Sequence, residues 1–183
     1  MSGRAGSDPV RPADRFLVFG APAIGDAEVA EVVASMRSGW LGTGPKVARF
    51  EGDFKAYKGA DHAMAVSSCT AALHLSMLAL GLRPGDEVIT TPMTFCATIN
   101  AIIHAGATPV LADIDPATMN IDPQRAAAAV TARTRAIVPV HFAGRPCAMD
   151  ELLDVAAAHN LAIIEDCAHA IETEYAGRKA GTF

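Results

Sequence analysis

The sequence predicts an α/β protein in which a mainly parallel β-sheet is covered by helices on both faces. From Ala63 onward, short runs with strand-like composition alternate with runs that have helical spacing, which is the order of βαβ units. The expected strands are also continuously apolar, as is typical of strands buried on both faces. With 51% hydrophobic and 19% charged residues, the 183-residue chain has the composition of a globular domain.

The residues before this pattern have a different character. Residues 1–18 begin MSGRAGSDPVRP and contain no apolar stretch, so we interpret them as a flexible leader rather than a targeting signal. Residues 19–60 form an N-terminal helical segment. Apolar spacing predicts one helix over Glu28–Met36 and a second over Val47–Tyr57, and the glycine-rich SGWLGTGP separates them.

Residues 61–183 contain the expected α/β part. Its strands are Ala63–Val66, Glu87–Thr91, Pro109–Asp113, Ala136–His141 and Ala162–Glu165. Its helices are Thr70–Leu80, Ala97–Ala105, Pro123–Val130 and Met149–His159. Start and stop signals support two of them. Ser67 and Ser68 precede the first of these helices and Gly81 follows it, while Asp122 and Pro123 open the third.

Charge and cysteine content exclude several function classes. The formal net charge is -5 with a pI near 5.6, so no basic surface for nucleic acid is expected. No window approaches the ~18 apolar residues of a membrane span. The cysteines form no CxxC pair, and we expect buried, reduced thiols in a cytoplasmic protein, without a disulfide framework or a metal site. They are Cys69, Cys96, Cys147 and Cys167.

Candidate site residues follow the ends of the expected strands, because an open parallel sheet binds ligands at the carboxyl ends of its strands. After the first strand, SSCTAALHL opens a helix whose free N–H groups can hold a phosphate, although an ordinary helix cap has the same composition. Phe95 follows the second strand and is either a stacking platform or a core residue. His141 ends the fourth strand, and we interpret it as a hydrogen-bonded, partly buried histidine.

The segment IIEDCAHA carries the most information about function. The four apolar residues 161–164 lead directly into two adjacent carboxylates, Glu165 and Asp166. A carboxylate at that edge is costly unless a donor or a positive group meets it. Asp166 is therefore either a helix cap or the partner of a protonated ring nitrogen, the device that keeps a pyridoxal cofactor an electron sink. This segment alone leaves both interpretations open.

In combination, these segments resemble the sugar aminotransferases of the DegT/DnrJ/EryC1/StrS family, which have the aspartate-aminotransferase fold (fold type I). The resemblance covers nearly all of residues 19–183 in order. The matching stretches are GWLGTGPKVARFE, AVSSCTAALHLSMLALGLRPGDEVITTPMTFCATINAI, GATPVLADIDPATMNID, RTRAIVPVHFAGRPCAMD and IIEDCAHAIETEYAGRKAGTF. The resemblance implies a three-layer αβα large domain, here truncated, that binds pyridoxal 5'-phosphate.

The resemblance also implies roles for individual residues. The backbone at Cys69, Thr70 and Ala71 receives the cofactor phosphate, and Phe95 stacks on the pyridine ring. Asp166 pairs with the ring nitrogen and His169 hydrogen-bonds the ring hydroxyl. The family usually has glycine where this chain has Cys69. The implied cofactor-binding residues are therefore Cys69, Thr70, Ala71, Phe95, Asp166 and His169.

The same resemblance implies the reaction and the position of the lysine that it needs. The activity is transfer of an amino group from glutamate to a nucleotide-linked keto-deoxy sugar, in a homodimer. The lysine that forms the Schiff base is expected beyond Phe183, so we expect no catalytic lysine here and no activity of the chain alone. The alternative is a non-catalytic remnant that acts as a binding or pairing module. A Rossmann oxidoreductase is disfavoured because no strand runs into GxGxxG.

Strand order adds one structural expectation. In fold type I the first strand lies beside two strands that come later in the chain than Phe183. We therefore expect four strands to stay adjacent. Ala63–Val66 should be displaced, disordered or paired with another molecule, and the chain should self-associate.

Overall fold

The computed structural model describes residues 22–183. The predicted leader over residues 1–18 lies outside the described residues. The chain divides into two compact units between Gly44 and Pro45. In the first unit, α1 (Asp26–Ser38) begins where the N–H of Gly25 donates to Glu28 Oε2 at 2.7 Å. It ends at Gly39, whose φ of +73° suits glycine.

The second unit, Pro45–Phe183, contains the sheet. Its elements in chain order are α2 (Pro45–Lys58), α3 (Cys69–Ala79), β1 (Glu87–Thr90), α4 (Cys96–His104), β2 (Thr108–Leu111), α5 (Pro123–Ala128), β3 (Thr134–Ile137), the 3-10 helix η1 (Phe142–Gly144), α6 (Met149–His159), β4 (Ala162–Ile163), β5 (Glu174–Tyr175) and β6 (Arg178–Lys179). Within this unit, β1 to β4 pair in the order β2-β1-β3-β4 and all pairs are parallel.

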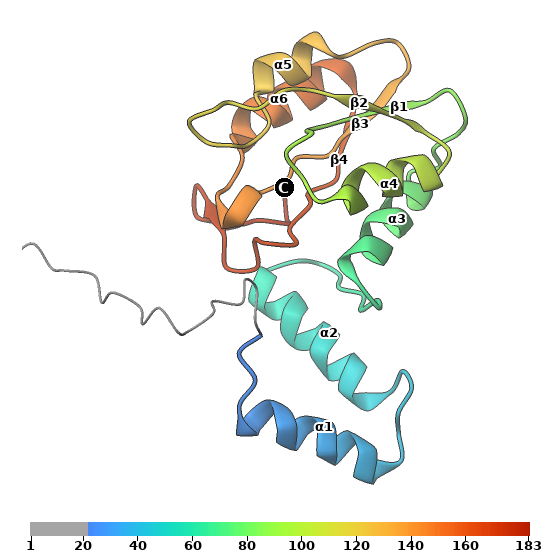
Figure 1. The fold of residues 1–183 in the computed structure, drawn as a ribbon, viewed down its shortest axis with the longest axis vertical. Coiled ribbons are helices and arrows are strands. Elements are labelled where there is room, and N and C mark those ends of the chain that lie inside the picture. The colour runs from blue at the N-terminus through green and yellow to red at the C-terminus, as the bar shows by residue number, and fades with distance from the viewer. Residues whose placement is uncertain (1–21) are drawn as a thin grey trace, which may run out of the picture. The chain divides into compact units, whose positions relative to one another are not determined.

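Helices cover both faces of this sheet, with α3 and α4 on one side and α5 and α6 on the other (Figure 1). Alternate strand residues point into two separate cores, as the pleat requires. Val88 of β1 packs with Met77 and Ile102 on the α3–α4 side. Ile89 packs with Met149 and Leu152 on the α6 side. The predicted αβα class with a mainly parallel sheet is confirmed.

The expected strand over Ala63–Val66 does not form, and this part of the prediction was wrong. The segment is irregular and lies outside the sheet. This agrees with the separate expectation that it is displaced from the other four strands. The N–H of Ala65 donates instead to Glu51 Oε1 of α2 at 2.8 Å. Within the described residues, β2 and β4 are the edge strands of the sheet.

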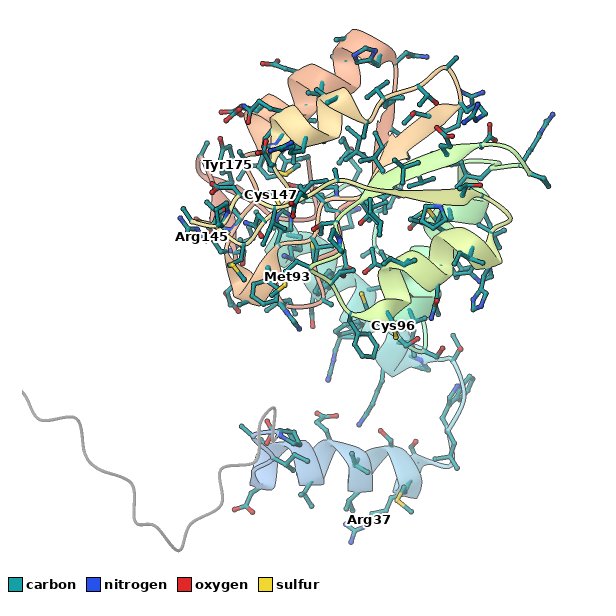
Figure 2. All side chains as sticks on the ribbon, turned by 45° about the horizontal axis from the view of Figure 1, so that its top comes forward. Arg37, Met93, Cys96, Arg145, Cys147 and Tyr175 are labelled. Atoms are coloured by element: carbon teal, nitrogen blue, oxygen red, sulfur yellow. The ribbon has the colours of Figure 1, made fainter. Side chains whose placement is uncertain are left out.

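The expected burial of the cysteines holds for only some of them. All four are free thiols, but Cys69 and Cys96 are exposed, whereas Cys147 is buried (Figure 2). Cys69 and Cys96 are each the first residue of a helix, α3 and α4, where only one side of the residue packs. In residues 22–183 no helix combines the length and the apolar character needed to cross a bilayer.

Candidate functional site

Asp166 is anchored by its backbone at the carboxyl end of the sheet. The chain leaves β4 at Ile163 and runs beside the continuation of β3. There, the N–H of Asp166 donates to Pro139 O at 2.9 Å, and its carbonyl accepts from the N–H of His141 at 3.2 Å. The residue is 5% exposed. Two main-chain hydrogen bonds therefore fix the backbone position of Asp166.

The Asp166 carboxylate is held by donors from two other segments. Oδ2 accepts a hydrogen bond of 2.7 Å from Oγ1 of Thr98 in α4, and Oδ1 accepts one of 3.1 Å from the N–H of Ala168. Sγ of Cys69 lies 4.0 Å from Oδ1. Residues 168–169 form a turn, so Asp166 closes an Asx-type turn rather than capping a helix. The helix-cap interpretation was wrong.

The N-terminus of α3 lies beside this carboxylate. Ser68 is its N-cap, as the sequence predicts, and its Oγ accepts from the N–H of Ala71 at 3.1 Å. The first N–H groups of a helix have no intrahelical acceptor. Ser68 satisfies the N–H of Ala71 and leaves those of Cys69 and Thr70 for a ligand. Burial, and then the charge of Asp166, raise the pKa of Cys69, so a neutral thiol stands there at pH 7.

Phe95 and His169 are both exposed. Phe95 precedes α4 at its N-cap position and is 75% exposed, so the alternative that it belongs to the core was wrong. An aromatic ring held this far from the core is available to stack on a planar ligand. His169 lies in the turn after Asp166. Of the predicted set, the structure brings Cys69 and Asp166 into direct proximity.

A cleft of about 600 Å³ opens in the sheet-containing unit. It lies between α2, the irregular segment 60–68 and the segment that follows β4, and both Ser68 and Cys69 line it. Phe50, Met64 and Ile171 contribute exposed apolar surface to its walls. The cleft therefore adjoins the N-terminus of α3.

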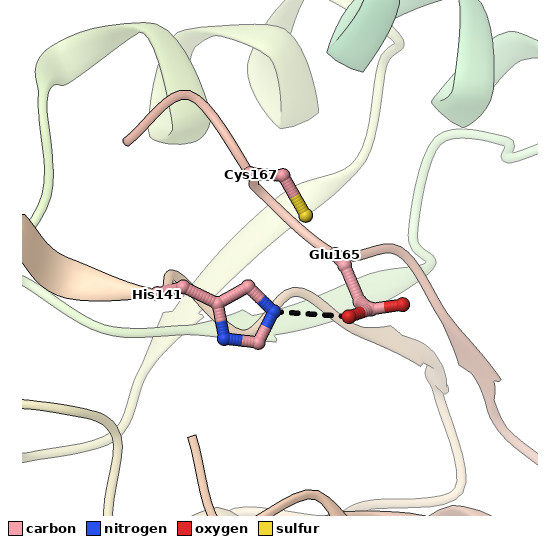
Figure 3. Close-up of side chains that lie close together, drawn as sticks. All are labelled: His141, Glu165 and Cys167. Carbon is pink, nitrogen blue, oxygen red and sulfur yellow. Dashed lines mark hydrogen bonds and ion pairs between the residues drawn. The ribbon is translucent and has the colours of Figure 1, made fainter. Parts of the chain in front are cut away.

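His141 is fully hydrogen-bonded, as its sequence context predicts, and it is more deeply buried than expected. Its Nδ1 accepts from the N–H of Cys147 at 3.1 Å, so Nε2 carries the proton and donates to Glu165 Oε2 at 2.9 Å (Figure 3). Burial raises the pKa of Glu165, but the bonds from His141 and from the N–H groups of Gly181 and Phe183 outweigh it and leave the pKa lowered. The pair is a neutral histidine on a carboxylate.

His141, Glu165 and Cys167 place one potential metal ligand each within 4.8 Å of one another. The donor set does not suit a metal ion, however. A metal on Nε2 of His141 displaces its proton, and Nδ1 cannot take that proton up because it faces the N–H of Cys147. Burial, and then the charge of Glu165, also raise the pKa of Cys167 to about 12, whereas a thiolate is the metal ligand.

Two site residues escaped the sequence interpretation. Thr98 of α4 binds Asp166 directly, and its hydroxyl also meets that of Thr94, which lies just before the N-cap of the helix. Lys58 at the end of α2 is buried, and its Nζ donates to the carbonyl oxygens of Ala170, Ile171 and Ala180. These partners lie more than 100 residues away in sequence, so no local pattern revealed them.

Solved structures similar to this chain include aminotransferases. The chain is 39% identical to S. venezuelae DesV, solved in complex with a ketimine intermediate, with a TM-score of 0.82 over 86% of this chain and 43% of that one. It is 36% identical to Spr1654 from Streptococcus pneumoniae, which is described as a putative sugar aminotransferase and was solved in its PLP form, with a TM-score of 0.85 over 90% of this chain and 46% of that one. These likenesses define the class: the chain has the fold of the sheet-containing part of fold type I, pyridoxal-phosphate-dependent aminotransferases.

Sequence comparison identifies the family within that class. A profile of the DegT/DnrJ/EryC1/StrS aminotransferase family matches residues 22–183, and the chain belongs to this family. It is 55% identical over 173 residues to the spore coat polysaccharide biosynthesis protein SpsC of Bacillus subtilis (strain 168). That match covers 94% of this chain and 44% of SpsC. The chain thus spans less than half the length of the relatives it matches.

The donor set of the site fits the family cofactor. The Asp166 carboxylate has about four lone-pair positions, and its bonds to Thr98 and Ala168 leave acceptor capacity for a protonated ring nitrogen. The N–H groups that open α3 suit a phosphate.

Proposed function

We propose that this chain supplies the cofactor-binding part of an aminotransferase that transfers an amino group from glutamate to a keto carbon of a nucleotide-linked deoxy sugar. The observation that carries the proposal is the buried, hydrogen-bonded carboxylate of Asp166 beside the N-terminus of α3. The sugar substrate is supported by the names of the relatives, which include a polysaccharide biosynthesis protein and a sugar aminotransferase. A cytoplasmic location and a homodimer are further parts of the proposal.

The chain's residues have distinct roles in this mechanism. Asp166 holds the proton on the ring nitrogen by its negative charge, and the N–H groups of Cys69 and Thr70 bind the phosphate. Phe95 covers one face of the ring, and His169 donates to or accepts from the ring hydroxyl. When bound, pyridoxal phosphate supplies the electron sink for amino transfer. Because the neutral thiol of Cys69 carries no charge, it does not repel the phosphate.

The proposal can be tested by restoring the length of the relatives. A chimera joins residues 1–183 to the part of SpsC that follows its matched region, and is loaded with pyridoxal phosphate. Incubation with glutamate alone is expected to release 2-oxoglutarate in an amount equal to the bound cofactor, because only half of the transamination can occur. A chimera that binds cofactor but releases no 2-oxoglutarate would contradict the proposed reaction.

The alternative function is a non-catalytic binding or pairing module. It is supported by two lysines whose amino groups are engaged in hydrogen bonds and are not free to react. Lys58 is buried against three carbonyl oxygens. Lys179 is half-buried and donates to Glu174 Oε1 at 3.0 Å and to the hydroxyl of Tyr57 at 3.3 Å. The hydrogen bond from Lys179 to Glu174 raises the pKa of Lys179, which lowers the share of reactive free amine.

We therefore expect the 183-residue chain to form no defined covalent adduct with pyridoxal phosphate. After borohydride reduction, peptide mass analysis should find only partial labelling spread over several lysines, because the engaged amines react slowly. Free lysine amide serves as the control for the reduction. A single lysine labelled to completion would overturn this expectation and show that the chain carries its own Schiff-base residue.

We also propose that the isolated chain self-associates. The β4 edge carries unpaired backbone groups, and the neighbouring cleft exposes apolar side chains. Light scattering should give a mass above the 19.0 kDa of one chain. Hydrogen exchange should be fast over residues 63–66, which lie outside the sheet. A monodisperse monomer with strong protection of these residues would contradict the proposal.

A further inference from the structure

Two threonine hydroxyls form a chain that ends on the Asp166 carboxylate. Thr98 Oγ1 lies 2.7 Å from Asp166 Oδ2, and Thr94 Oγ1 lies 2.7 Å from Thr98 Oγ1. Thr98 is 0% exposed and sits in the apolar helix α4. A threonine inside a helix commonly bonds to the carbonyl four residues earlier. Here the hydroxyl of Thr98 reaches a different segment of the fold.

The direction of these hydrogen bonds follows from the acceptor at the end. An ionised carboxylate only accepts, so Thr98 must donate its single hydroxyl proton to Asp166. The Thr98 oxygen is then left as an acceptor, and Thr94 donates to it. The order is therefore Thr94 to Thr98 to Asp166. The last bond is charge-assisted, which makes it the stronger of the two.

We propose that Thr94 and Thr98 are positioning residues that aim the Asp166 carboxylate at the cofactor ring. This inference rests on the proposed function. The terminal torsion of an aspartate is soft, so backbone anchoring alone does not set the plane of the carboxylate. Thr98 fixes Oδ2 and the N–H of Ala168 fixes Oδ1. With both oxygens held, the plane of the carboxylate, and with it the orientation of the remaining lone pairs, is fixed.

The same hydroxyls connect Asp166 to the residue expected to stack on the ring. Thr94 and Thr98 flank Phe95, and the N–H of Thr98 donates to Phe95 O at 3.2 Å. The turn that carries Phe95 is thus tied to the loop that carries Asp166. The two threonines therefore hold Asp166, the proposed partner of the ring nitrogen, in a fixed position relative to Phe95, the proposed stacking residue. Alignment of this kind to within about 0.5 Å is what a productive site needs.

The test compares three substitutions in the 183-residue chain. Thr98→Val removes the hydroxyl at nearly constant shape, and Thr98→Ser retains it. Thr90→Val is the matched control, because Thr90 is also 0% exposed and its Oγ1 donates to Val138 O at 2.9 Å, inside the sheet. The readout is the carboxyl carbon signal of Asp166 in the ligand-free chain, measured by nuclear magnetic resonance.

Thr98→Val is expected to shift or broaden this signal, whereas Thr98→Ser and Thr90→Val leave it in place. An unshifted signal in Thr98→Val would overturn the relay. If Thr98→Val does not fold, Thr94→Val removes the first hydroxyl from a half-buried position. It should produce a smaller shift of the same signal, and no shift would again overturn the proposal.

A second readout separates the relay from the proposed function. In the SpsC chimera, Thr98→Val should slow 2-oxoglutarate release about tenfold with little change in KM, because a misaligned carboxylate weakens the transition state more than substrate binding. Thr98→Ser should restore the rate. If Thr98→Val shifts the Asp166 signal but Asp166→Asn leaves the rate unchanged, the relay stands and the proposed function fails. If only Asp166→Asn slows the reaction, the relay fails.

Discussion

Replacing Asp166 with asparagine in the SpsC chimera is expected to slow 2-oxoglutarate release from glutamate on the order of 10³-fold. That is the loss found when one preorganised electrostatic contact to the reacting system is removed. Asparagine retains the shape of the side chain and an acceptor for the N–H of Ala168, but it has no charge to hold a proton on the ring nitrogen. The rate is measured in a single turnover, so that the sugar need not be identified.

The matched control for this variant is Asp113→Asn. Asp113 is an exposed aspartate that follows β2, and its Oδ1 accepts from the N–H of the next residue at 2.8 Å. β2 lies at the opposite edge of the sheet from β4, so its charge should not reach the site and the rate should stay within twofold of the parent chimera. An Asp166→Asn variant that is as fast as Asp113→Asn would remove Asp166 from the mechanism.

Replacing Lys58 with methionine is expected to produce a large loss of stability, because its buried ammonium is removed. The Lys58 ammonium donates to Ile171 O at 2.8 Å and to Ala180 O at 2.9 Å, with a longer contact to Ala170 O. Methionine keeps most of the apolar stem but removes the ammonium donor from the carbonyls of Ile171 and Ala180, whereas Ala170 O still accepts from the N–H of Thr173. An unsatisfied buried acceptor costs about 1–3 kcal/mol, so we expect a loss on the order of 3 kcal/mol.

Urea unfolding measures this loss as a lower midpoint at unchanged slope. The control is Lys55→Met, one turn earlier on α2, where the side chain is exposed and the change should stay within about 0.5 kcal/mol. Equal midpoints for the two variants would show that the carbonyls near Lys58 find other donors. The prediction would then be wrong.

The sequence predicted local elements well and failed where distant segments decide. The predicted helix Met149–His159 coincides with α6, because apolar spacing and the absence of breakers are local signals. The run that ends at His141 was expected to be strand throughout, but β3 covers Thr134–Ile137. Beyond Ile137 the pairing with β4 reduces to a single bridge between Val140 and Asp166. The composition of one run cannot reveal where its partner strand stops.

The turn between β5 and β6 was missed for a related reason. Ala176 and Gly177 have φ values of +50° and +78°, as a two-residue hairpin turn requires. Each flanking strand has only two residues, too few for an alternating pattern to be visible in the sequence. At the site, the sequence located Asp166 from its own flanks. Thr98 and Lys58 acquire their roles only through the tertiary fold.

Glu165 and Asp166 are adjacent carboxylates that face in different directions. Asp166 turns toward α4 and α3, while Glu165 accepts the N–H groups of Gly181 at 2.8 Å and Phe183 at 2.9 Å. One peptide unit therefore joins the carboxylate that faces α3 and α4 to the carboxylate that holds the backbone of residues 181–183. Any coupling between a ligand at Asp166 and the conformation of residues 181–183 must be reciprocal, so that each favours the other by the same factor.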